Sequence, residues 1–429
     1  MDDAQVESQQ WSPQDEHTEH TKPPKPAPTT KSKRFESIDT LRGFALLGIL
    51  LPNIIYFAWP MAAATDYTVM GDSPANKLAH TITTTAFLGK FMFMFAMLFG
   101  SGVIMYARKF DHADEHGNYH SKLRRGALLW YSRCAWLLLF GIMHAYLLWY
   151  GDILTYYAIA GLTLMWWTRR LNPKLQFFGG LTLYYLGSIL MIAFSALGYW
   201  ALGEGHITAN ELSADPAIEI AGYTGTYFDA FKTRFFTTLI MQLTIGILFL
   251  PLLWGIMLMG MGLTRMGILT GERSLKFYVI AAIVLLGIGI PLTGYSYVFT
   301  EHTFDLIPGF IWQSLAQPVG VPLALGYAAM IIALSKWAPA KLVCIPLAAV
   351  GRMALTNYFL HTILCTTFFY GYGMGYFASV EFPQLWLVIL SVWTINIVFS
   401  MLWLRFFTMG PFEWLWRVLT YRKLVPIRA

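Results

Sequence analysis

Runs of about 20 apolar residues recur along nearly the whole chain of 429 residues. Each run is long enough to cross a hydrocarbon core about 30 Å thick as a helix. Charged residues make up only 13% of the chain, about half the share in a soluble domain. The runs are too long for barrel strands and follow a helical period. We therefore expect an all-α, polytopic membrane protein and exclude an ordinary soluble domain.

The apolar runs predict about ten spans, and between about eight and twelve would fit the pattern. Their approximate limits are residues 43–62, 80–106, 127–149, 153–168, 176–201, 236–264, 275–299, 308–334, 349–371 and 384–406. Of the 30 Lys and Arg residues, 24 fall on alternate connections. Such one-sided alternation predicts an even number of spans with both termini in the cytoplasm. We expect an integral protein of a bacterial inner (plasma) membrane.

The regions outside the spans differ in composition. Residues 1–35 are polar and proline-rich, and we expect a disordered cytoplasmic tail. Residues 36–408 form the predicted membrane domain, with an outer loop at 202–232 that is either a small polar cap or a passive connector. Residues 409–429 interleave aromatic and basic side chains, which predicts an interfacial C-terminal helix and tail.

Composition also limits cofactors and partners. The three cysteines lie inside apolar runs, which excludes a disulfide framework or a zinc ribbon. The basic residues are scattered over short loops, so we expect no nucleic-acid partner. We expect no metal site, and membrane lipids as the surroundings. The sequence leaves homo-oligomerisation open.

Ionisable residues inside spans are costly and are functional candidates by default. They are Lys90, Arg133, His144, Arg352 and His361, with His80 at an outer edge and Asp152 at the outer tip after the third span. Permanent cations without buried carboxylates favour an anionic ligand, and Arg42 stands at the edge of the first span. Simpler roles remain open: Arg133 reaching the headgroups, His144 in an interhelical hydrogen bond, and Asp152 capping a helix.

The spacing of residues within a span predicts which side chains share a helix face. Arg133 and His144, eleven residues apart, return to one helix face within about 20°, about 16 Å apart along the axis. In a continuous ninth span, Arg352 and His361 point to opposite faces, whereas Asn357 and His361 share one. Asn53 follows Pro52, and it either contributes to a site or satisfies the backbone at a kink.

Several of these residues lie in segments that resemble a known family, the YeiB-like proteins (domain of unknown function 418). The segments are 38–54, Lys90–Phe91 with 98–102, His144 with 151–154, 351–358 and 410–417, and the resemblance covers about residues 36–424. The opening is also remotely similar to transmembrane acyltransferases, namely the lysosomal heparan-α-glucosaminide acetyltransferase family and the bacterial acyltransferase-3 group. In both, a Leu/Phe-Arg-Gly motif, here at residues 41–43, is followed eleven residues past the arginine by a polar residue, here Asn53.

The remote resemblance implies a membrane-embedded acyltransferase that moves an acyl group from cytoplasmic acyl-CoA to an unidentified acceptor. It implies His144 or His80 as general base, with His80 matching by spacing an essential histidine of the glucosaminide group. Asp152 would orient the base and Asn53 would stabilise an oxyanion. Arg42, Lys90, Arg133, Arg352 and Asn357 would bind the ligand. Acyl-CoA is expected as a co-substrate and not as a tightly bound cofactor.

Two other functions stay open. A transporter of an anionic small molecule would line its path with the same cations, although proton-coupled carriers usually place Asp or Glu at mid-membrane. A non-catalytic scaffold or lipid-binding protein does not readily explain several cations within the spans.

Overall fold

The structure, a computed structural model, describes residues 36–110, 119–206, 215–304 and 308–428. Within these ranges the regular elements are helices, apart from one isolated β-bridge between Phe407 and Arg428. This confirms the predicted all-α fold class. The predicted tail at 1–35 lies outside the described residues.

In chain order the α-helices are α1 (Glu36–Ala58), α2 (Pro74–Ile82), α3 (Lys90–Ala107), α4 (Tyr119–Met143), α5 (Leu154–Ala160), α6 (Trp166–Thr168), α7 (Pro173–Gly203), α9 (Pro216–Thr224), α10 (Tyr227–Leu243), α11 (Ile245–Arg265), α12 (Leu275–Thr303), α13 (Pro308–Val319), α14 (Val321–Lys336), α15 (Lys341–Arg352), α16 (Ala354–Phe369), α17 (Phe382–Phe406) and α18 (Pro411–Tyr421). Three π-helical turns interrupt them, η4 (Thr83–Phe87), η5 (His144–Leu148) and η6 (Gly161–Met165). Short 3-10 turns are η2 (Met61–Ala64), η3 (Tyr67–Met70) and η7 (Ala338–Ala340).

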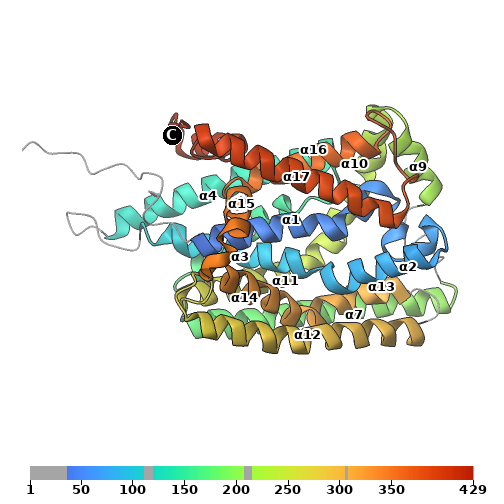
Figure 1. The fold of residues 1–429 in the computed structure, drawn as a ribbon, viewed down its shortest axis with the longest axis horizontal. Helices are drawn as coiled ribbons and strands as arrows, with labels where there is room; N and C mark the ends of the chain where they lie inside the picture. Colours follow the sequence, from blue (N-terminus) through green and yellow to red (C-terminus); the bar gives the residue numbers. More distant parts are fainter. Residues whose placement is uncertain (1–35, 111–118, 207–214, 305–307, 429) are drawn as a thin grey trace, which may run out of the picture.

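The long helices run roughly parallel around α1, while α15 crosses their direction (Figure 1). Helix α1 contacts α3, α14, α15 and α16. In the most apolar stretch of α1, 78% of the residues are buried inside the bundle, whereas the buried share of the corresponding stretch of α12 is 17%. Helix α1 is therefore the core of the bundle, and the exposed apolar faces of α7, α12 and α17 suit contact with lipid.

Glycines bring α1 and α15 into backbone contact. A Cβ at Gly43 would collide with the Leu347 carbonyl, and one at Gly351 would collide with the Asp39 carbonyl. Only the absence of a side chain at these two positions allows such an approach. This contact places Arg42 of α1 beside Arg352, the last residue of α15.

The described residues contain seven helices, or up to nine when each of two bent pairs counts as one span, that are long and apolar enough to cross a membrane. The predicted span at 153–168 corresponds to α5, η6 and α6, which together are shorter than the roughly 20 residues that a bilayer requires. The predicted span at 236–264 is divided at Thr244 between α10 and α11. The predicted spans at 308–334 and 349–371 are bent pairs, with angles of 53° and 86°.

Basic connections gather at one end of the bundle. Arg265 donates to the Arg169 carbonyl at 3.3 Å, and Lys336 donates to the Gly271 carbonyl at 2.6 Å. These bonds join connections that the charge alternation predicts on one side. At the other end, α9 of the outer loop approaches η2, where the Met61 amide donates to the Glu219 carboxylate at 2.8 Å.

Candidate functional site

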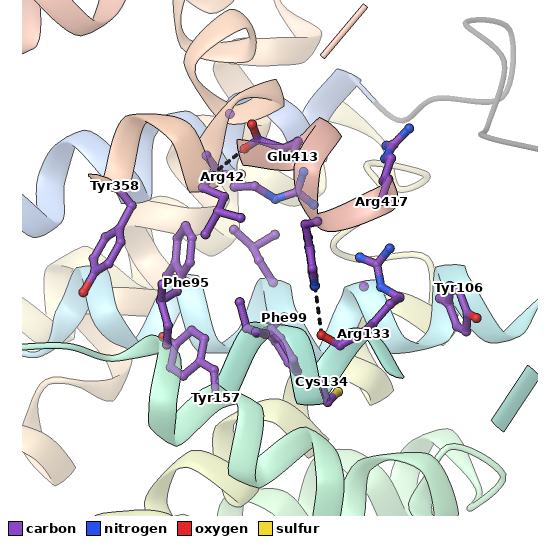
Figure 2. A pocket seen from close by; sticks show the side chains of 18 of the residues that line it. Arg42, Phe95, Phe99, Tyr106, Arg133, Cys134, Tyr157, Tyr358, Glu413 and Arg417 are labelled. Carbon is purple, nitrogen blue, oxygen red and sulfur yellow. Dashed lines mark hydrogen bonds between the residues drawn. The ribbon is translucent and has the colours of Figure 1, made fainter. Parts of the chain in front are cut away.

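A pocket of about 250 Å³ lies towards the basic end, between α1, α3, α4, α5, α15, α16 and α18. Among the residues that the structure describes, its lining includes the four arginines Arg42, Arg133, Arg352 and Arg417 and one carboxylate, that of Glu413. The remaining walls are largely apolar and aromatic: Phe95, Leu98, Phe99, Gly102, Tyr106, Trp130, Cys134, Leu137, Leu154, Tyr157, Gly351, Ala354, Leu355, Tyr358 and Trp416. Arg133 and Arg417 lie at one end and Tyr358, Phe95 and Tyr157 at the other (Figure 2). The pocket is therefore amphipathic, with a cationic end and an aromatic end.

Arg133 is held against aromatic rings. Its guanidinium lies 4.0 Å from the Trp416 ring centroid and 5.6 Å from that of Tyr106. The Trp416 indole N–H donates to the Arg133 carbonyl at 2.9 Å, which ties α18 to α4. A guanidinium that stacks on a ring keeps its edge accessible, so it can form a bidentate hydrogen-bonded contact with a planar anion. Arg133 therefore lines the pocket and stacks on the ring of Trp416.

The other predicted arginines are also anchored. Arg42 pairs with Asp39 one turn earlier in α1, at 3.1 Å between nitrogen and oxygen. Arg352 donates to the Thr408 carbonyl at 3.2 Å. These contacts hold the side chains of Arg42 and Arg352 at the pocket.

Glu413 of α18 caps the N-terminus of α16. Its carboxylate accepts hydrogen bonds from the Leu355 amide at 2.6 Å, the Thr356 amide at 3.2 Å and the Thr356 hydroxyl at 2.6 Å. Helix N-termini leave amide donors unpaired, and a carboxylate satisfies them and complements the helix dipole. Burial raises the pKa of Glu413, and these hydrogen bonds oppose the rise. Glu413 thus fixes α16 beside the pocket.

His144 and Asp152 form a buried pair behind the aromatic end. The Nδ1 atom of His144 lies 3.0 Å from Oδ1 of Asp152, and Nε2 lies 2.8 Å from the Thr362 hydroxyl. The second Asp152 oxygen accepts from the Thr155 amide at 2.8 Å, so the aspartate caps α5 while its other oxygen lies beside the imidazole. The Nδ1 and Oδ1 atoms lie at ion-pair distance but do not meet hydrogen-bond geometry. Because a carboxylate can only accept, its position favours the tautomer with a proton on Nδ1 and Nε2 as the acceptor.

Tyr358 connects the two groups of residues. It lines the pocket, and its ring centroid lies 4.8 Å from that of His144. Its hydroxyl accepts from the Ile153 amide at 3.3 Å, next to Asp152 in the chain. His144 itself has no exposed surface and is absent from the lining.

The other predicted site residues lie outside this lining. Lys90 is buried at the start of α3, 5.9 Å from the Trp312 ring centroid. His80 lies among Ala64, Tyr67 and Phe382 near the outer loops. The side chain of Asn53 is half-buried in the C-terminal third of α1.

Asn357 and His361 are both buried in α16. The Asn357 amide donates to the Val350 carbonyl at 3.2 Å and to the Ser400 hydroxyl at 2.8 Å, so it ties together α15, α16 and α17.

The prediction that Arg352 and His361 occupy opposite faces of one helix is wrong. Helix α15 ends at Arg352, Met353 leaves the helical conformation, and α16 begins at Ala354 after a bend of 86°. Helical periodicity does not continue across such a break. Arg352 enters the pocket because of the bend, whereas His361 lies deeper along α16.

Four residues of this region were missed as candidates. They are Tyr358, Thr362, Glu413 and Arg417, and all but Thr362 fall in segments that carry the family resemblance. Sequence reasoning assigned 410–417 only to the membrane interface. An acidic residue in an otherwise basic, aromatic helix is the one signal that could have singled out Glu413.

Comparisons with known proteins agree with the resemblance. Residues 263–423 match the family described as "Protein of unknown function (DUF418)". The chain is 31% identical to the uncharacterized protein YxaH of Bacillus subtilis, over 93% of this chain and 97% of that protein. It is 32% identical to the uncharacterized protein YeiB of Escherichia coli, over 92% of this chain and 98% of that protein. No solved structure matches. The chain belongs to the YeiB-like DUF418 family of polytopic helical membrane proteins.

Proposed function

We propose that the protein transfers an acyl group from acyl-CoA, bound in the arginine-lined pocket, to an acceptor that meets His144. The observation that carries the proposal is the adjacency of two features: a pocket with four arginines and one carboxylate, and a buried His144–Asp152 pair behind one of its walls. Guanidinium groups suit the phosphates of the coenzyme. The apolar walls suit its acyl end.

The orientation follows from charge. The pocket lies towards the end where the basic connections meet, and such connections usually face the cytoplasm. A cytoplasmic opening would give access to acyl-CoA. A pocket of about 250 Å³ is below the usual range for a drug-sized ligand. We therefore expect it to enclose only part of the coenzyme and to leave the adenosine outside.

His144 would act as the general base. With Asp152 holding the proton on Nδ1, Nε2 can take a proton from an acceptor hydroxyl or amine. The Thr362 hydroxyl, 2.8 Å from Nε2, marks the position that such an acceptor group would occupy. The acceptor oxygen or nitrogen would bond to the thioester carbonyl carbon. The C–S bond would then break, and His144 would return the proton to the leaving thiolate.

The proposal is tested by the thermal stability of detergent-purified protein with increasing acetyl-CoA and longer acyl-CoAs. A ligand that binds the folded state raises stability as RT ln(1 + [L]/Kd). We expect a saturable rise that Arg352→Ala reduces strongly. The matched control is Arg405→Ala, because Arg405 is in the last turn of α17 and outside the lining.

Two results would overturn the proposal. One is no shift with any acyl-CoA up to millimolar concentration, and the other is an equal shift in both arginine variants. The first result would favour transport of a smaller anion, which a solute uptake assay in vesicles measures directly.

A further inference from the structure

The arginine-lined pocket and His144 are adjacent but not connected. Tyr358 lines the pocket, and its ring centroid lies 4.8 Å from that of His144 with the two planes tilted by 36°. His144 itself is fully buried and outside the described lining. Direct contact between a pocket ligand and Nε2 is therefore blocked in this conformation. Any chemistry that uses both groups requires a change at this wall.

Tyr358 belongs to both sets of residues. The rings packed on His144 are those of Trp149, Tyr358 and Phe359, and of these only Tyr358 is among the described residues of the pocket lining. Phe359 instead stacks on Phe412 of α18, with centroids 4.3 Å apart. Tyr358 is thus the ring that the His144 surroundings share with the described pocket lining.

The Tyr358 ring is held at its tip by two contacts of its hydroxyl, one with the Ile153 amide and one with the Asp152 side chain. The hydrogen bond from the Ile153 amide to its hydroxyl is long, at 3.3 Å. A neutral hydrogen bond contributes about 1 kcal/mol net, and a long one less. The backbone of α16, in contrast, is fixed at its N-terminus by three hydrogen bonds to Glu413. The geometry therefore favours rotation of the side chain over movement of the helix.

The pocket offers space for that rotation. A tyrosine in a helix has two accessible χ1 rotamers, which direct the ring to different sides of its own turn. Tyr358 is among the residues that line the pocket of about 250 Å³. A ligand that fills only the cationic end would leave the ring in place.

We propose that the Tyr358 side chain is a movable partition between the arginine-lined pocket and the His144–Asp152 pair, and that it must leave its present position before a pocket ligand meets the imidazole. The purpose of this partition rests on the proposed function, but the contacts of Tyr358 do not depend on that function. Tyr358 is a positioning residue, since it controls which groups meet.

The test uses the purified full-length protein and diethyl pyrocarbonate, a small reagent that modifies neutral imidazole. Mass spectrometry measures the modification rate of His144, with His361, which is 3% exposed, as an internal reference. We expect slow modification of the unmodified protein and a rate at least about tenfold higher in Tyr358→Ala. Tyr358→Phe keeps the ring and loses the hydroxyl contacts with Ile153 and Asp152, so we expect a smaller rise.

Phe359→Ala is the matched control, because it removes a ring that packs on His144 from outside the pocket. Equal rates in Tyr358→Ala and the unmodified protein would overturn the inference. An equal rise in Phe359→Ala, or a parallel rise at His361, would also overturn it, since either indicates general loosening.

Coenzyme A separates this inference from the proposed function. Protection of His144 by coenzyme A in Tyr358→Ala supports both, because the reagent then enters through the occupied pocket. A faster rate in Tyr358→Ala without protection supports the partition and counts against acyl-CoA as the ligand.

Discussion

Glu413→Ala should open the N-terminal turn of α16 and leave the rest of the bundle closed. The carboxylate accepts from two backbone amides and one hydroxyl on α16. Removing it leaves the Leu355 and Thr356 amides without their partner in a buried position, at a cost of about 1–3 kcal/mol each. Water that enters the site partly replaces the lost hydrogen bonds, so we expect a total cost of about 3 kcal/mol for the two amides. Glu413→Gln keeps one acceptor oxygen and should cost about 1 kcal/mol.

Hydrogen–deuterium exchange measures this local opening. Since about 1.4 kcal/mol is a factor of ten, we expect peptides that cover residues 354–358 to exchange roughly 100-fold faster in Glu413→Ala. Peptides from α7 and α12 should not change. Glu381→Ala is the matched control, because Glu381 stands at the N-cap of α17 and its side chain makes no capping hydrogen bond.

Two outcomes would refute this reasoning. Unchanged exchange at residues 354–358 would mean that Glu413 does not hold α16. Faster exchange throughout the bundle would mean that Glu413 contributes to global stability and not to the placement of one helix.

Three further predictions concern other parts of the bundle. Burial raises the pKa of Glu219 from 4.5 to about 7, so the folded protein retains a proton that the unfolded chain releases. Stability should therefore fall by about 3 kcal/mol as the pH rises from 4.5 through 7, and Glu219→Gln should abolish this fall in thermal unfolding. Asn357→Ala should destabilise the bundle by about 2 kcal/mol, because the bonds to Val350 and Ser400 are lost, and a lowered unfolding temperature would measure it. Asp152→Asn should reduce acyl transfer by about 10²–10⁴-fold while acyl-CoA affinity stays the same, measured as transfer rate against Kd.

The membrane fold could be predicted from sequence because burial in lipid imposes long apolar runs. The basic connections could be assigned to one side because Lys and Arg gather on alternate connections along the chain. The helix breaks could not be predicted. Gly89 adopts a left-handed conformation just before Lys90, and Met353 interrupts the ninth span, yet apolar composition continues through both points. Hydrophobicity reports residence in the membrane and says little about helix continuity.

The candidate site was predictable only in its charged residues. Arg133 and Arg352 stood out because a cation in an apolar run is rare, and Arg42 stood out through the motif at residues 41–43. The structure brings all three to one pocket. Tyr358 could not be distinguished, since the chain has 23 tyrosines and only the packing of α16 against η5 places this one beside His144. Lys90 was equally prominent in sequence, but the turn at Gly89 places it beside Trp312 instead.

The occupancy of the pocket is most directly measured with an acyl-CoA whose acyl chain carries a photoreactive diazirine. After irradiation, mass spectrometry identifies the crosslinked peptides in the purified protein. We predict crosslinks within residues 95–106 of α3 and around Tyr358 of α16, competed by unlabelled acetyl-CoA and reduced in Arg352→Ala. Crosslinks confined to the lipid-facing residues of α7 and α12, or crosslinks that acetyl-CoA does not compete, would contradict acyl-CoA binding in the arginine-lined pocket.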